Sequence, residues 1–297
     1  MARKFEGVFP VVCIPFNEEE EVDEENLRRL VRFLIEKEIS GVCVPAIGSE
    51  FYKLSDSERK KVVEIVIDEV DHRVPVITGV GHPSVKVALE YTGHAEVAGA
   101  DGILVFPPYF VPPTEENLVH YFKRIGESTS LPMMIQDAPQ QSGVTMSIPT
   151  LARMKDKISN FQYIKIEALP LGPKTSAVFR AFQDKLRIFC GHGGMFLLDA
   201  LSRGACGVMP GCAFADVLMH IYNKYTKGEK QKAREIFHNL LPFLVLESPS
   251  VEVFLASEKE VIRRRGVFSS SFTRQPGEKL DEVYLDEIRS FVERLAS

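Results

Sequence analysis

No run of apolar residues in this 297-residue sequence reaches the roughly 18 residues that a membrane-spanning helix needs. The first five residues also lack the apolar core of a secretory signal. The five cysteines include no C-x-x-C pair and no metal-ligand spacing. We therefore expect a cytoplasmic protein with buried thiols and no membrane association, bound metal or other cofactor.

A strong excess of either charge is also missing. The 36 Lys and Arg against 41 Asp and Glu leave a formal net charge of -5, and the basic run Arg263-Arg264-Arg265 is short. Such a balance gives no general attraction to nucleic acid or to an anionic membrane. With 45% hydrophobic and 26% charged residues, the chain can bury a large core. The expected partners are small molecules or further copies of the same chain.

Eight short apolar segments, each followed by a helical pattern, recur at intervals of roughly 20 to 35 residues. The helical pattern that follows the second segment starts with Ser55-x-x-Glu58, the signature of a capping box. Short apolar strands are typical of a parallel sheet that is buried on both faces. The pattern therefore predicts an α/β fold, a (β/α)8 TIM barrel. The expected strands cover residues 8–14, 41–45, 74–78, 102–106, 132–136, 161–166, 186–190 and 205–209.

The rest of the chain predicts a helical appendage. Three further helical patterns cover about 229–245, 250–264 and 281–296. We expect a barrel over residues 1–227 and a C-terminal helical extension over 228–297 that packs on it. An open, doubly wound sheet is the alternative fold, but no G-x-G-x-x-G fingerprint follows the first strand.

The pentapeptide Tyr163-Ile-Lys-Ile-Glu167 places a lysine inside an apolar strand. Strand side chains alternate between faces, so Lys165 and Glu167 should project to the same side. If that side is the barrel interior, burial disfavours the charged ammonium, and a neutral amine can attack a carbonyl. A solvent-facing lysine on an edge strand or a structural salt bridge would give the same pattern.

Active sites of such barrels form at the C-terminal ends of the strands. There the second strand offers Gly48 and Ser49, whose turn could hold a carboxylate through backbone N–H groups and the hydroxyl. The other candidate substrate-binding residues are Tyr109 after the fourth strand, Gln136 and Asp137 at the fifth, His192 after the seventh and Met209 at the eighth. His192 could hydrogen-bond a substrate hydroxyl, although a loop histidine is also commonly just solvated.

Characteristic segments lie along nearly the whole chain. They are Gly48-Ser49-Glu50, Gly79-Val80-Gly81-His82, 98–102, 107–112, Ile164-Lys165, 204–208, Arg264-Arg265-Gly266 and Arg274-x-Pro276-Gly277. Together they make the chain resemble the dihydrodipicolinate synthase / N-acetylneuraminate lyase superfamily of class I aldolases. The resemblance implies a (β/α)8 barrel with a C-terminal helical extension, in a homo-oligomer, often a tetramer built from dimers. It also implies a Schiff base between Lys165 and pyruvate or another 2-oxo acid, with Tyr109 near a neighbouring subunit's site.

The departures from the superfamily pattern indicate a branch of it. Gly48-Ser49 stands where two threonines are usual, and Gln136, which cannot titrate, replaces a proton-relaying tyrosine. Gln141 falls where dihydrodipicolinate synthases hold the aldehyde substrate with an arginine. The pattern looks closer to L-2-keto-3-deoxyarabonate dehydratases. In that interpretation Glu167 removes the C3 proton and Gln136 orients the substrate.

Three functions therefore remain open at this point. A Schiff-base lyase would dehydrate a 2-keto-3-deoxy sugar acid, or cleave it to pyruvate by a retro-aldol reaction. A dihydrodipicolinate synthase would share the iminium step and differ in its second substrate. A protein that binds a 2-oxo or sugar acid without turnover, as a sensor or scaffold, would need no acid or base near the lysine.

Overall fold

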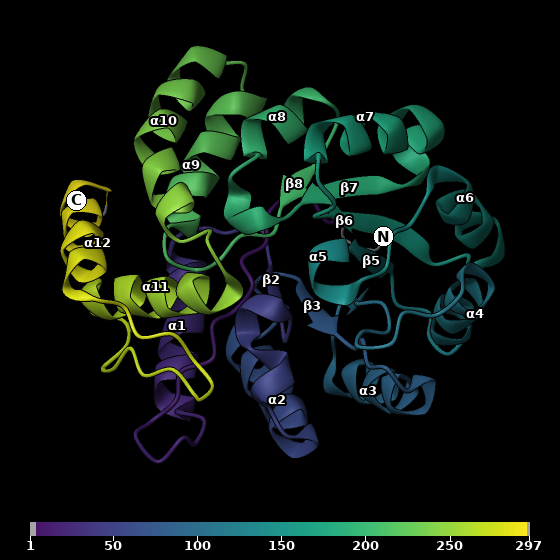
Figure 1. The fold of residues 1–297 in the computed structure, drawn as a ribbon, viewed down its shortest axis with the longest axis horizontal. Helices are drawn as coiled ribbons and strands as arrows, with labels where there is room; N and C mark the ends of the chain where they lie inside the picture. The colour runs from purple at the N-terminus through teal and green to yellow at the C-terminus, as the bar shows by residue number, and fades with distance from the viewer. Residues whose placement is uncertain (1–3, 296–297) are drawn as a thin grey trace. The chain divides into compact units, whose positions relative to one another are not determined.

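Strands and helices alternate over residues 7–226 of the computed structural model, which describes residues 4–295, and further helices follow (Figure 1). The architecture is the predicted (β/α)8 barrel with additional C-terminal helices. The strands are β1 (Gly7–Val8), β2 (Val42–Val44), β3 (Val76–Gly79), β4 (Gly102–Val105), β5 (Met133–Asp137), β6 (Phe161–Ile166), β7 (Arg187–Cys190) and β8 (Gly207–Val208). The helices between and after the strands are α1 (Glu24–Glu36), α2 (Asp56–Val70), α3 (Val85–Ala98), α4 (Glu115–Gly126), α5 (Pro139–Ser142), α6 (Ile148–Lys157), α7 (Leu171–Phe182), α8 (Leu197–Ser202), α9 (Ala215–Thr226), α10 (Lys230–Leu246), α11 (Val251–Arg264) and α12 (Glu282–Leu295).

Contacts between Cα atoms divide the described residues into two compact units. The first unit holds residues 4–6, 75–191 and 196–208, and the second holds 7–74, 192–195 and 209–295. The domain boundary expected between residues 227 and 228 stays a prediction.

The first unit is built on a parallel sheet in which β3, β4, β5, β6, β7 and β8 follow one another in chain order. Most of its strand residues are buried, because α3, α4, α6, α7 and α8 belong to the same unit and lie around the strands (Figure 1). The pairing of β5 with β6 shifts between Met133 and Met134 and then runs regularly from Met134 opposite Tyr163 to Asp137 opposite Ile166. The shift therefore lies upstream of Lys165 and leaves its alternation with Glu167 undisturbed.

In the second unit, α9 and α10 lie side by side and α12 lies next to α11 (Figure 1). Aromatic rings pack within this unit. The ring of Phe243 on α10 lies edge-on to two others, with centroid distances of 4.8 Å to Phe214 and 5.7 Å to Phe291 of α12. The predicted capping box starts α2, since the Ser55 side chain accepts from the Glu58 N–H and the Glu58 carboxylate accepts from the Ser55 N–H.

The structure corrects three of the expected elements. The first strand covers only Gly7–Val8, with an isolated bridge from Val11 to Cys43, because Pro10 has no N–H for a continuous ladder. The helix α5 was not predicted, and the eighth strand covers only Gly207–Val208 instead of the expected 205–209. Ala296, the expected end of the last helix, lies outside the described residues.

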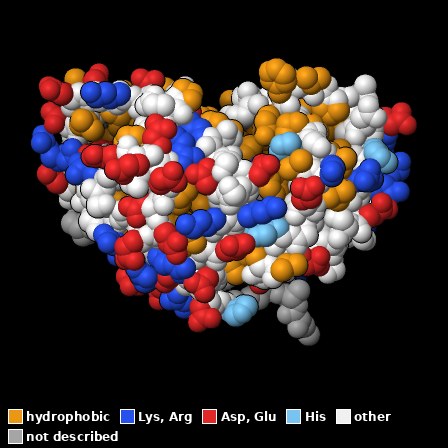
Figure 2. Space-filling view, turned by 90° about the horizontal axis from the view of Figure 1, so that it is seen from below, with side chains coloured by type: hydrophobic (Ala, Val, Ile, Leu, Met, Phe, Trp, Pro, Cys, Tyr) orange, Lys and Arg blue, Asp and Glu red, His pale blue; other side chains and the backbone are white. Residues whose placement is uncertain are grey.

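Acidic and basic side chains are interspersed with neutral ones over the face shown in Figure 2, as the near-balanced composition predicts. Within residues 4–295, every helix is too short or too polar to cross a membrane.

Candidate active site

Lys165 lies near the carboxyl end of β6, and its side chain is buried. The strand is internal, paired with β5 on one side and β7 on the other. The residue is 3% exposed, so the solvent-facing interpretation of this lysine is wrong. Burial keeps water away from this amine, so Lys165 stays the candidate nucleophile.

Glu167 lies on the same side as Lys165, which confirms the expected alternation. Its Oε1 is 3.4 Å from Lys165 Nζ, and its Oε2 is 2.5 Å from Gln136 Nε2. Gln136 is the register partner of Lys165 on β5 and is 1% exposed. The Gln136 amide must donate here, because an ionised carboxylate can only accept. The three side chains thus form a row in which the amide fixes the carboxylate and the carboxylate faces the amine.

Asp137 belongs to a different contact. It pairs in register with Ile166 and is fully buried, and its Oδ2 is 3.1 Å from Nζ of Lys174 on α7. The Lys174 ammonium also donates to the carbonyl of Met146. Burial raises the pKa of Asp137, and the neighbouring lysine opposes that rise. The sequence pattern suggested that Asp137 acts together with Gln136, but in the structure the Asp137 carboxylate contacts helix α7.

Gly191 and Cys190 complete the surroundings of Glu167 in the first unit. A Cβ on Gly191 would lie 2.2 Å from Glu167 Oε1, so only glycine leaves room for that carboxylate. Burial raises the pKa of the Cys190 thiol to about 12, which keeps it protonated and unreactive. Cys13, Cys43, Cys190 and Cys212 are buried thiols that form no disulfide, as the sequence predicts, and Cys206 is half-buried.

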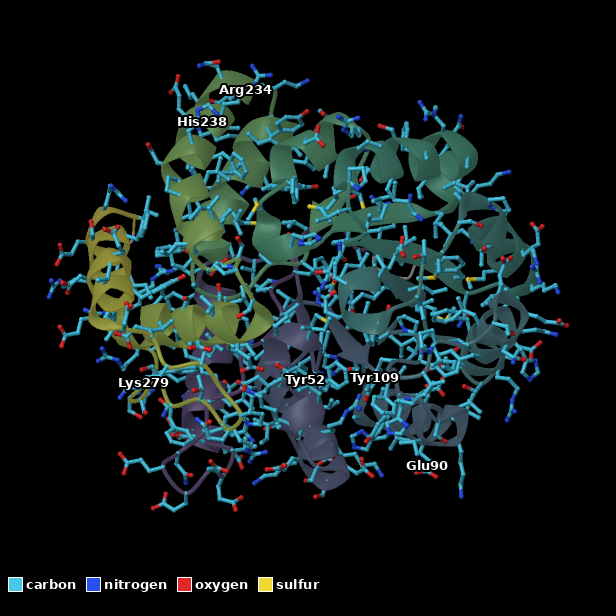
Figure 3. The ribbon with its side chains drawn as sticks, viewed as in Figure 1. Tyr52, Glu90, Tyr109, Arg234, His238 and Lys279 are labelled. Atoms are coloured by element: carbon cyan, nitrogen blue, oxygen red, sulfur yellow. The ribbon has the colours of Figure 1, made fainter. Side chains whose placement is uncertain are left out.

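Tyr109, which is labelled in Figure 3, follows β4 and is half-buried. The centroid of its ring lies 5.7 Å from that of Phe106. The next residue, Phe110, is 95% exposed and has a φ of 74°, a conformation that bulky residues rarely adopt. The aromatic segment that follows the fourth strand is therefore partly turned outward.

In the second unit, Gly48 and Ser49 belong to a short 3-10 turn, Ile47–Ser49. Ser49 is fully buried, and its Oγ has no hydrogen-bond partner within the described chain. A Cβ on Gly48 would lie 3.2 Å from Val11 Cγ1, so the turn is closely packed. Buried hydroxyl groups are nearly always satisfied, which makes this one a candidate ligand contact.

His192 and Met209, the remaining sequence candidates, also belong to the second unit. His192 is half-buried with a left-handed φ of 51°, and Met209 is 2% exposed. The same unit holds two buried carboxyl groups, Glu247 and Glu258, which interact electrostatically. No sequence motif marks this pair.

The Glu247–Glu258 pair must hold a proton. Glu258 Oε2 accepts from the N–H groups of Cys212, at 2.5 Å, and Ala213, at 2.8 Å. No N–H or O–H donor of residues 4–295 reaches either oxygen of Glu247. Burial raises the pKa of Glu258 to about 7 and that of Glu247 well above its usual value. Glu247 is therefore the protonated partner at neutral pH.

Sequence patterns did not reveal four residues of these contacts, because none of them lies in a strand: Lys174, Gly191, Glu247 and Glu258. A lysine three residues after Leu171 and an acid in an amphipathic helix look like ordinary surface residues. In the part of the chain that the structure describes, no three His, Cys, Asp or Glu side chains cluster as a metal site.

Comparison with known proteins places this (β/α)8 barrel among Schiff-base-forming enzymes. A family model described as "Dihydrodipicolinate synthetase family" matches residues 4–295. L-2-keto-3-deoxyarabonate dehydratase of Azospirillum brasilense is 30% identical over 295 residues, which cover 97% of this chain and 94% of that protein. The 4-hydroxy-tetrahydrodipicolinate synthase of Methanothrix thermoacetophila is 34% identical over 242 residues, 81% of each chain.

The structural comparison agrees. A crystal structure of dihydrodipicolinate synthase from Rhodopseudomonas palustris superposes with a TM-score of 0.91 at 29% identity, covering 98% of both chains. The chain belongs to the dihydrodipicolinate synthetase family. It is a Schiff-base lyase that acts on small molecules, as the sequence predicted.

Proposed function

We propose that the protein dehydrates a 2-keto-3-deoxy sugar acid through an iminium on Lys165. The observation that carries this proposal is the row of Lys165, Glu167 and Gln136, with a carboxylate 3.4 Å from a buried amine. A nucleophile beside a base that a third group orients is the arrangement that covalent catalysis requires.

The first step forms the iminium. The Glu167 carboxylate accepts the proton that the Lys165 ammonium must lose, and the neutral amine attacks the C2 carbonyl of the substrate. The carbinolamine hydroxyl then takes that proton back from Glu167 and leaves as water, which restores the carboxylate and leaves a C=N+ bond to Nζ. That bond withdraws electrons from C3 and makes a C3 proton acidic.

The second step eliminates water. Glu167 removes one C3 proton, the electron pair moves into the enamine, and the C4 hydroxyl leaves as water when it receives a proton. Hydrolysis of the remaining iminium restores the Lys165 amine and releases a dehydrated 2-oxo acid. Gln136 cannot donate or accept a proton by titration, so in this proposal it orients Glu167 and the substrate.

Retro-aldol cleavage is the nearest alternative within the same class. It needs a base at the C4 hydroxyl rather than at C3, and it releases pyruvate. The dehydratase of Azospirillum brasilense aligns over 97% of this chain, which supports dehydration.

Dihydrodipicolinate synthase activity is the second candidate, supported by the 34% identity to the Methanothrix thermoacetophila enzyme. Two residues weigh against it. Gln136 stands where that reaction uses a tyrosine, and Gln141 is an exposed residue of α5 where it uses an arginine. A binding protein without turnover is the third, and the carboxylate beside Lys165 weighs against it.

The substrate contacts belong to the same proposal. Gly48 and Ser49 would bind the C1 carboxylate, with the unpartnered Ser49 hydroxyl as one donor. Tyr109, His192 and Met209 would contact the rest of the substrate. Asp137, predicted as a substrate contact, fits a structural role better because its carboxylate faces Lys174. A tetramer or dimer remains the expected assembly.

Borohydride reduction in the presence of pyruvate, followed by peptide mass mapping, tests the iminium. We expect a reduced adduct on Lys165 in the wild-type protein and none in K165A. Lys155 is the internal control, because burial lowers its pKa and its Nζ donates to the Phe161 carbonyl. A folded protein that forms no adduct with pyruvate or with any 2-keto-3-deoxy acid would favour the binding-protein alternative.

Turnover of 2-keto-3-deoxy acids then distinguishes the reactions. Dehydration yields a product 18 Da lighter than the substrate and no pyruvate, whereas retro-aldol cleavage yields pyruvate that lactate dehydrogenase detects. Condensation of pyruvate with aspartate semialdehyde would establish the synthase activity instead.

A further inference from the structure

The helix α11 is unusual because it is buried on all sides although it is charged. Eight consecutive residues, from Leu255 to Ile262, are buried, including Glu258, Lys259 and Glu260. Successive residues of a helix point about 100° apart, so these three charged side chains must meet three different surroundings. Lysine is almost never fully buried without a partner, which makes the 0% exposure of Lys259 informative.

The partner of Lys259 is Glu50, the residue that directly follows Ser49. The Lys259 ammonium forms an ion pair with Glu50 Oε1, and it also lies 3.3 Å from the carbonyl oxygen of Phe272. The other oxygen, Oε2, is 3.1 Å from Lys53 Nζ. The fully buried Glu50 carboxylate is thus held from two directions.

Glu50 needs such support because its backbone is in the left-handed region, with a φ of 54° and a ψ of 35°. A residue with a Cβ is strained in that conformation, which persists where the surrounding structure enforces it. Phe254, also on α11, lies 3.4 Å from the position of a Cβ on Gly48. The helix therefore holds the turn at Gly48 and at Glu50, the two residues that flank Ser49.

We propose that Lys259 is a positioning residue for the substrate-carboxylate turn, acting on Ser49 through Glu50. This inference rests on the proposed function, in which Gly48 and Ser49 bind the carboxylate. The Ser49 hydroxyl is buried and unsatisfied within the described residues, so its position depends on the backbone on either side. A turn fixed before the ligand arrives binds the carboxylate with less loss of entropy.

Lys259 is a sharper test position than Lys53. Lys53 Nζ also lies 2.6 Å from Glu252 Oε2, and that carboxylate accepts from the Tyr52 hydroxyl, at 2.6 Å (Tyr52 is labelled in Figure 3). Substituting Lys53 would therefore disturb a second ion pair. Lys259→Met keeps the length of the side chain, removes its charge from Glu50, and otherwise gives up only contacts with the Phe272 carbonyl and the Phe16 ring.

The experiment compares pyruvate with its methyl ester, which has the same ketone but no carboxylate. The concentration of each that gives half of the maximal borohydride-trapped adduct on Lys165 is measured. In K259M we expect this concentration to rise roughly tenfold for pyruvate and less than about twofold for the ester, at the same maximal adduct. Equal changes for both ligands, or no change in a protein with native circular dichroism, would overturn the proposal.

Two further variants keep the test interpretable. E50Q/K259M removes one charge of each sign, so it should fold even where K259M does not, and it should show the same selective loss of pyruvate binding. Wild-type affinity in this double variant would mean that charge imbalance, rather than positioning, caused the effect, and would overturn the proposal. K232M, at a lysine of the same unit whose side chain is 65% exposed, is the control expected to behave as wild type.

The outcome separates this inference from the proposed function. If the wild-type protein forms no pyruvate adduct, the iminium proposal itself is wrong. If it forms the adduct and K259M discriminates between ester and acid as well as the wild type does, only the role of Lys259 is wrong.

Discussion

Buried ionic groups occur in both compact units, and they differ in how fully they are paired. In the first unit, Lys165 faces a single carboxylate at 3.4 Å, longer than a good charge-assisted hydrogen bond. In the second, both oxygens of Glu50 contact an ammonium, from Lys53 and Lys259. A loosely paired amine can change partner and react, whereas a carboxylate held by two cations fixes the backbone that carries it. Burial alone does not distinguish the two cases, but the pairing does.

The largest effect should come from Lys165→Met. This substitution removes the proposed nucleophile, so kcat should fall roughly 10^4-fold or more. Because the lysine is weakly paired, its loss should leave the melting temperature unchanged or raise it. Lys259→Met should do the reverse and lower the melting temperature. Thermal unfolding and turnover of both variants measure this, and a K165M protein that melts well below wild type would refute the contrast.

Lys174→Met should destabilise the protein by about 3 kcal/mol, because it leaves the buried Asp137 carboxylate without its ion pair. The double variant D137N/K174M should recover part of that loss. Urea unfolding gives the free energies. Arg153, which pairs with Glu115 at about half exposure, is the matched control, and R153A should cost less than about 1 kcal/mol.

Glu167→Gln should lower kcat by roughly 10^2-fold while Lys165 still forms the borohydride-trapped adduct slowly. The amide cannot accept a proton, but it occupies the same space beside Gly191. Single-turnover trapping and steady-state rates give the two values. An unchanged kcat would show that another residue is the base. It would then contradict the contrast between the loosely paired, reactive Lys165 and the doubly paired, structural Glu50.

The smallest effect concerns the Glu247–Glu258 pair and is a dependence on pH. Unfolded glutamates titrate near the ordinary value of 4.5, whereas burial raises the pKa of Glu258 to about 7. Between these values the folded protein retains a proton that the unfolded chain releases. Stability should therefore fall as pH rises from 4.5 to 7, by up to about 1.4 kcal/mol per pH unit for each proton that the folded pair retains.

The variant E247Q should weaken that slope, because its amide has no proton to release as the pH rises. Unfolding free energies at pH 5, 6 and 7 give the slope. Glu235, an exposed residue of α10, is the control, and E235Q should keep the wild-type slope. A wild-type protein whose stability is flat over this range would show that the pair shares no proton.

Most of the fold could be predicted because its signals are local. The eight apolar segments, the Ser55 capping box and the alternation of Lys165 with Glu167 depend on neighbours within a few residues. The first strand was overestimated because apolar residues on both sides hid the effect of Pro10 on hydrogen bonding. Asp137 was grouped with Gln136 because adjacent residues of a strand look alike in sequence although they point to opposite faces.

By itself, the sequence determined the order of strands and helices, the family and the strand position of Lys165, since period, caps and motifs are properties of neighbouring residues. Only the tertiary structure decided which charges meet. Lys174 reaches Asp137 from a helix 37 positions later, and Lys259 reaches Glu50 from 209 positions later. Such pairs carry no local pattern, because the energy of a buried ion pair depends on distance in space and on the exclusion of water.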